Sequence, residues 1–232
     1  NIGNNGTGIY AAGGTVNLNA GSSLNVSNDQ SVGVYALNGT NILNDGTTVL
    51  GNNSFGYVLR SGSALLNNAD VTAGDGSIVV FGDGAGNITN NGAVTLGGSS
   101  GVAFYTVNGG NIQNTGDITG TAGKNNVGIY NVGGGIVNNG IVAIGDSDIA
   151  YKKDSLGNYI YDVNGNRILD AENSKYAVGL YGEDSAISNS ASGNITVGEG
   201  SIGIATKGGS GINDGVITGT GESTRGMYTE KG

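Results

Sequence analysis

The chain has 232 residues, of which 48 are Gly and 32 are Asn, and it contains no Pro, Cys, Trp or His. This composition argues against helices, since Gly costs about 1 kcal/mol at each interior helix site and Asn prefers turns and caps. It also excludes disulfides and leaves no thiolate or imidazole ligand for a metal. The formal net charge of -9 argues against a nucleic-acid partner, which would need clustered Lys and Arg.

A short sequence of aliphatic, small, aliphatic and aromatic residues recurs from one end of the chain to the other. Its first copy is Gly8-Ile9-Tyr10 and its last is Arg225-Gly226-Met227-Tyr228. The small residue stands at positions 8, 33, 56, 79, 103, 128, 179, 203 and 226. Successive copies are therefore 23 to 25 residues apart, except for one interval of 51. This spacing predicts a unit of about 24 residues that is interrupted by one insertion.

An asparagine recurs with the same spacing, and a Gly or Ala follows it two residues later. A third short apolar stretch comes next, as in Val94-Thr95-Leu96. Each unit thus holds three strand-length pieces separated by turn residues. Stacked asparagine amides can hydrogen-bond to one another, so we predict a structural ladder. Its members are Asn19, Asn44, Asn67, Asn90, Asn114, Asn138, Asn189 and Asn213.

Three short strands in every repeat predict an all-β fold, a right-handed parallel β-helix (solenoid) of about nine coils. Coils stacked at about 4.8 Å would give a rod roughly 40 Å long. A leucine-rich repeat would need more Leu, and a propeller blade would need about 40 residues. We expect residues 1–232 to be a single domain. Because the chain begins and ends inside a repeat, we also expect it to be a fragment of a longer passenger.

The insertion at 148–175 has a different composition, with four of the nine basic residues and several tyrosines. Alternating apolar and polar residues flank Asn164-Gly165, which predicts a β-hairpin loop. Loops that carry Tyr and charge on a rigid scaffold often bind partners. An insertion without a binding role is the open alternative. The candidate contact residues are Tyr151, Lys152, Lys153, Tyr159, Tyr161 and Arg167.

The chain offers no recognisable catalytic, metal or cofactor site. A β-helix glycosidase or lyase needs carboxylates gathered on one wall, whereas Asp45 and Asp214 share a phase but lie many coils apart. We therefore predict no enzymatic activity. The recurring aromatic residue, as in Tyr105 and Tyr130, has two open interpretations: an outward strip that meets a partner, or rings that fill the core.

The repeat units, such as Asn126-Val127-Gly128-Ile129-Tyr130 followed by Gly135-Ile136-Val137-Asn138, resemble the passenger repeats of type V autotransporters. They are most similar to those of the very large fusobacterial outer-membrane adhesins. The resemblance covers the chain apart from the insertion. It implies a cell-surface location, with anchoring through a membrane barrel outside this segment. It also implies adhesion to glycans or surface receptors of host cells or other bacteria.

The expected function is therefore a rigid adhesin stalk, monomeric and without cofactors, that presents a loop-borne binding surface. Two alternatives stay open, a polysaccharide-degrading β-helix enzyme and a pure structural spacer. A surface groove with two carboxylates about 5–9 Å apart would favour the enzyme.

Overall fold

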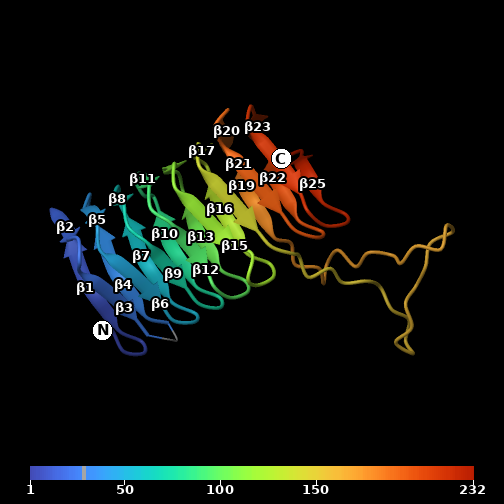
Figure 1. Cartoon of the computed structure of the whole chain (residues 1–232), viewed down its shortest axis with the longest axis horizontal. Coiled ribbons are helices and arrows are strands. Elements are labelled where there is room, and N and C mark those ends of the chain that lie inside the picture. The colour runs from blue at the N-terminus through green and yellow to red at the C-terminus, as the bar shows by residue number, and fades with distance from the viewer. Residues whose placement is uncertain (28–29) are drawn as a thin grey trace.

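The computed structural model describes residues 1–27 and 30–232, and in it the chain winds into a stack of coils (Figure 1). The described part of the chain contains 25 strands, and none of its residues is helical. No segment among them is therefore a helix that could span a membrane. The strands of successive coils pair in parallel throughout the stack. The predicted parallel β-helix is thus confirmed, and its right-handed sense stays a prediction that the preference of parallel crossovers supports.

Each of the first eight coils contributes one strand to each of three sheets that run along the stack, and the last coil adds a ninth strand to one of them. Sheet 1 contains β1 (Thr7–Ala12), β4 (Val32–Leu37), β7 (Phe55–Arg60), β10 (Ile78–Asp83), β13 (Val102–Val107), β16 (Val127–Val132), β19 (Val178–Glu183), β22 (Ile202–Lys207) and β25 (Arg225–Glu230). Sheet 2 contains β2 (Thr15–Leu18), β5 (Asn41–Asn44), β8 (Ala64–Asn67), β11 (Asn87–Asn90), β14 (Asn111–Asn114), β17 (Gly135–Asn138), β20 (Ala186–Asn189) and β23 (Ser210–Asn213). Sheet 3 contains β3 (Ser23–Val26), β6 (Thr47–Leu50), β9 (Val71–Ala73), β12 (Val94–Leu96), β15 (Asp117–Gly120), β18 (Ile141–Ile144), β21 (Asn194–Val197) and β24 (Val216–Gly219).

The core consists of apolar columns, because alternate strand residues point inward and repeat at every level. In sheet 2, Ile88 pairs with Ile112 and Ile112 with Ile136, and all three side chains are buried. Burying one such side chain contributes about 1.5–3 kcal/mol. A single coil would leave each of these side chains exposed on two sides, so the stack is stable only as a unit.

The predicted asparagine ladder lies at the corner between sheets 2 and 3. Asn90 Nδ2 donates to Asn114 Oδ1 at 2.8 Å, and Asn114 Nδ2 donates to Asn138 Oδ1 at 2.8 Å. The same Asn114 Nδ2 also donates to the Gly116 carbonyl at 3.0 Å. Each amide from Asn67 to Asn213 thus links neighbouring coils and also donates to a backbone carbonyl of its own turn. The continuous ladder comprises Asn44, Asn67, Asn90, Asn114, Asn138, Asn189 and Asn213.

Asn19 lies outside this ladder, so its assignment was wrong. Leu18 is the residue that pairs with Asn44. The reason is a corner of different length: two residues separate β1 from β2, whereas three separate β4 from β5. The shift moves Asn19 one position past the column. As a result, the buried Oδ1 of Asn44 accepts no hydrogen bond at this end of the ladder.

The strands of sheet 1 resolve the two interpretations of the aromatic residue. In β13, Ala103 and Phe104 are both buried, whereas Val102 and Tyr105 face outward and are half-buried. The aromatic residue therefore forms an outward strip. The small residue, such as Ala103, faces inward. A Cβ on Gly128 would lie 2.5 Å from the Gly179 carbonyl oxygen, which explains the preference for Gly here.

Candidate interaction surfaces

Residues 148–175, which we call the arm, leave the wall of the stack between β18 and β19. The arm projects well beyond the coils and divides at its tip (Figure 1). Its base is closed by two backbone hydrogen bonds of 2.9 Å between Asp148 and Lys175, one in each direction. The chain therefore leaves and re-enters the stack at one point, and the coils on either side stay in register.

The arm has three legs joined by two tight turns, and a third turn at 171–173 near its base, where one hairpin was predicted. Three residues spaced eight apart donate to one another in a ring: Ile160 N to Lys152 O at 3.0 Å, Ile168 N to Ile160 O at 2.9 Å, and Lys152 N to Ile168 O at 2.8 Å. Antiparallel bridges join Lys153 to Tyr159 and Tyr161 to Arg167. The predicted turn at Asn164-Gly165 is the second of the two.

Aspartates fix both turns. The Oδ1 atom of Asp162 accepts from the amides of Asn164 and Asn166 at 2.8 Å, and Asp154 Oδ1 accepts from Leu156 and Asn158 at 2.9 Å. These backbone hydrogen bonds, foremost those from Asn158 and Asn166, lower the pKa of both carboxyl groups. Both carboxylates are thus engaged in holding the turns.

The structure brings four of the six candidate contact residues together on the arm. The Arg167 guanidinium lies 4.3 Å from the ring centroid of Tyr159 and 5.6 Å from that of Tyr151. Lys153 Nζ lies 4.9 Å from the Tyr159 centroid. The two rings meet edge to face, with centroids 6.3 Å apart. These contacts order an exposed cationic and aromatic cluster, of the residue types that dominate many binding interfaces.

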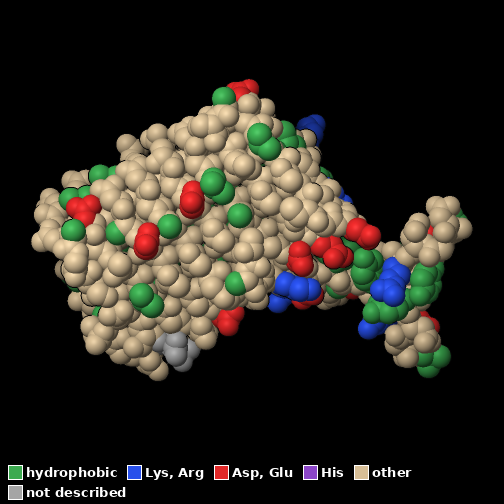
Figure 2. Space-filling model, viewed as in Figure 1, with side chains coloured by type: hydrophobic (Ala, Val, Ile, Leu, Met, Phe, Trp, Pro, Cys, Tyr) green, Lys and Arg blue, Asp and Glu red, His purple; other side chains and the backbone are tan. Residues whose placement is uncertain are grey.

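The other two candidates adjoin this cluster through the backbone of the arm, without a ring contact among the described residues. Tyr161 is 54% exposed, and Lys152 is exposed while its backbone joins the legs. Figure 2 shows Lys or Arg and hydrophobic side chains gathered on the arm, whereas the visible face of the coils is mostly uncharged.

A cleft of about 680 Å³, which we call the arm cleft, separates the arm from the corner of the last coils. Sequence reasoning missed its coil side, which Glu199, Ser223 and Arg225 form. The repeat spacing could have revealed it. Val178, Ile202 and Arg225 occupy the same position in successive coils, so Arg225 lies two coils above the base of the arm. The full lining is Ile149, Tyr151, Tyr161, Gly165, Asn166, Arg167, Leu169, Tyr176, Glu199, Gly200, Ser223 and Arg225.

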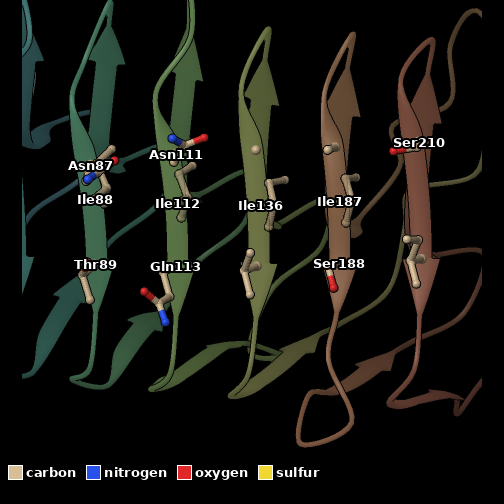
Figure 3. A pocket seen from close by; sticks show the side chains of 14 residues that line it. Asn87, Ile88, Thr89, Asn111, Ile112, Gln113, Ile136, Ile187, Ser188 and Ser210 are labelled. Atoms are coloured by element: carbon tan, nitrogen blue, oxygen red, sulfur yellow. The ribbon is translucent and has the colours of Figure 1, made fainter.

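A second, smaller groove of about 470 Å³ lies on the outer face of sheet 2 (Figure 3). Outward side chains such as Asn111 and Gln113 border it, and between them lies the backbone of Ile112 and Ile136, whose side chains point into the core. Among the described residues that line it, none is acidic. The groove therefore lacks the carboxylate pair that glycoside hydrolysis requires.

The outward aromatic strip of sheet 1 is packed within itself. The rings of Tyr105 and Tyr130 lie 4.8 Å apart, and those of Tyr130 and Tyr181 lie 4.4 Å apart and nearly parallel. Partial burial, and then the negative charge of Glu183 together with the neighbouring tyrosines, raises the pKa of Tyr130 to about 12. Contact between successive rings favours a structural role for this strip.

Acidic residues are dispersed over the coils. Within the part of the chain that the structure describes, no three residues of the types Asp, Glu, His and Cys form a group that could hold a metal ion. Asp83 pairs with Arg60, which lowers the pKa of its carboxyl group, and Glu183 pairs with Lys207 at 2.8 Å. Both pairs join neighbouring coils at the surface.

Comparison with known proteins gives one family. A family model described as the BigA third pectate lyase-like domain matches residues 6–232, which is nearly the whole chain. No curated protein and no solved structure matches the sequence.

Proposed function

The chain belongs to the family of the BigA third pectate lyase-like domain, and from this premise we propose that it is a rigid segment of a bacterial surface adhesin. The coils act as a stalk, and the arm is the contact surface. Partners are receptors or glycans on host cells or other bacteria. The segment works as a monomer and without a cofactor.

The arm is the observation that supports this function best. It is the one described segment that leaves the coils, and it carries exposed Tyr, Lys and Arg side chains held by ring contacts. Ordered aromatic and guanidinium groups bind partners at a low cost in side-chain entropy. The stack of coils acts as a spacer that holds the arm at a distance from the structure to which the stack is attached.

We further propose that the parent protein is exported as an autotransporter passenger and anchored in the outer membrane by a part outside this segment. The resemblance of the repeat units to autotransporter passenger repeats motivates this step, and so does the absence of Cys, because disulfides would hinder passage through a pore.

A non-catalytic role is part of the proposal. The groove on sheet 2 has no acidic lining residue among those described, and the arm cleft contains one carboxylate, that of Glu199. Acid and base catalysis on a sugar chain needs two carboxyl groups about 5–9 Å apart.

The test is adhesion by the full-length parent protein after deletion of residues 151–172. We expect adhesion to fall at least tenfold, with unchanged surface display. The matched control is the double variant Thr89→Ala/Gln113→Ala on the outer face of sheet 2, which should adhere normally. Unchanged adhesion after the deletion would refute the contact role of the arm and leave a spacer.

A further inference from the structure

Two arginines face the arm cleft from opposite sides. Arg167 belongs to the arm and Arg225 to β25, the last strand of sheet 1. The ion pairs of the described residues are Arg60 with Asp83 and Lys207 with Glu183, so neither cleft arginine forms an ion pair, and the two arginines outnumber Glu199, the one carboxylate in the described lining. In a chain with net charge -9, two unpaired guanidinium groups beside one cleft form a local site for a negative group.

The position of Arg167 is fixed without an acid. Its guanidinium lies over the rings of Tyr159 and Tyr151, at 4.3 and 5.6 Å from their centroids. Such contacts hold the planar group in one orientation while its N–H donors stay available at the edge. A carboxylate that approaches this edge can accept two hydrogen bonds at once.

The opposite side of the cleft rests on the coils. Tyr176 packs against the small apolar cluster of Val178, Ile202 and Ala205, and Arg225 follows Ile202 in the same column. Glu199 and Ser223 lie at the neighbouring corners. This side offers an aromatic ring, a cation, a carboxylate and a hydroxyl group on a rigid wall.

The remaining lining selects between kinds of anion. Three tyrosines, Tyr151, Tyr161 and Tyr176, line the cleft, and pyranose rings pack their apolar faces against such rings. The Glu199 carboxylate and the Asn166 amide can accept and donate hydrogen bonds to hydroxyl groups. The volume of about 680 Å³ lies within the range of small-ligand sites, about 300–1,000 Å³.

From these observations we propose that the arm cleft binds a saccharide bearing a carboxylate, with Arg167 and Arg225 on the acidic group and the tyrosines on the sugar rings. This rests on the proposed adhesive function and names its ligand class. An acidic peptide would satisfy the two arginines and would leave the hydroxyl-matching groups of Glu199 and Asn166 without a role.

The proposal is tested with the whole chain by calorimetric titration of sialyllactose and of a glucuronate-terminated disaccharide, with lactose as the neutral comparison. We expect a carboxylated sugar to bind at least tenfold more tightly than lactose, and less tightly as salt is raised. Arg167→Gln and Arg225→Gln should each weaken binding about tenfold. Lys124→Gln makes the same charge change outside the cleft and should leave binding unchanged.

Equal affinity for lactose, no binding of either acidic sugar, or equal weakening by Lys124→Gln would overturn the proposal. Tighter binding of a hexaglutamate peptide than of either sugar would also overturn it. These outcomes are separable from the adhesive function. If the 151–172 deletion abolishes adhesion while no acidic sugar binds, the arm contacts its partner in another way.

Discussion

Replacing Asn114 by Ala should destabilise the stack more than replacing any exposed asparagine by Ala. Its fully buried side chain makes three hydrogen bonds: it accepts from Asn90 Nδ2 and donates to Asn138 Oδ1 and to the Gly116 carbonyl. A buried hydrogen bond contributes about 1 kcal/mol net, and a stranded buried polar group costs about 1–3 kcal/mol. The expected loss in the free energy of unfolding is therefore about 3–5 kcal/mol.

The assay is equilibrium urea unfolding followed by circular dichroism and tyrosine fluorescence. With a slope of about 1–3 kcal/mol per molar urea, the midpoint should fall by about 1 M or more. Asn111→Ala is the matched control, because Asn111 lies in the same strand and its side chain is exposed. This control should change stability by less than about 0.5 kcal/mol. Equal midpoints for the two variants would show that the ladder does not stabilise the coils.

Three further predictions concern the core, its titration and the arm. Gly128→Ala should cost about 1–3 kcal/mol in a thermal or urea melt, because the new Cβ would meet the Gly179 carbonyl oxygen and Val142, whereas Gly226→Ala has open space and should be neutral. Burial raises the pKa of Tyr57 to about 12, so the stability that its neutral form provides is complete below pH 10 and is lost as pH rises towards 12. In the variant Tyr57→Phe, the free energy of unfolding should therefore depend less steeply on pH between 10 and 12. An unchanged slope would contradict this. Deletion of residues 151–172 should leave the melting temperature within a few degrees of the parent, because the two hydrogen bonds between Asp148 and Lys175 close the base; a lost transition would mean that the arm stabilises the stack.

The stack could be predicted because each level repeats the same chemistry. Val94 and Ile118 occupy the same inward position one coil apart, and periodic spacing alone puts them in one column. Asn67 and Asn90 were assigned to the ladder on the same basis. The error at Asn19 arose where a corner is one residue shorter, because spacing between units does not show where within a unit the difference falls.

The candidate site was less accessible from sequence. The arm contains an eight-residue repeat, visible as Asp154, Asp162 and Asp170, which predicts successive similar turns and would have indicated more than one hairpin. The partners of the arm in the cleft, Glu199 and Arg225, are distant in sequence. Their proximity depends on the direction in which the arm leans from the wall, and no local pattern encodes that direction.

The most direct test of the account is whether residues one coil apart are vertical neighbours. Thr89 pairs with Gln113, and Gln113 with Val137, on the outer face of sheet 2. Adjacent coils lie about 4.8 Å apart, within the Cα separation of disulfides, about 4.4–6.8 Å, whereas two coils span about 9.6 Å. The chain has no native Cys, so the double variant Thr89→Cys/Gln113→Cys should form an intramolecular disulfide on oxidation, and Thr89→Cys/Val137→Cys should not. Failure of the first pair, or equal yield from the second, would contradict the stacked coil.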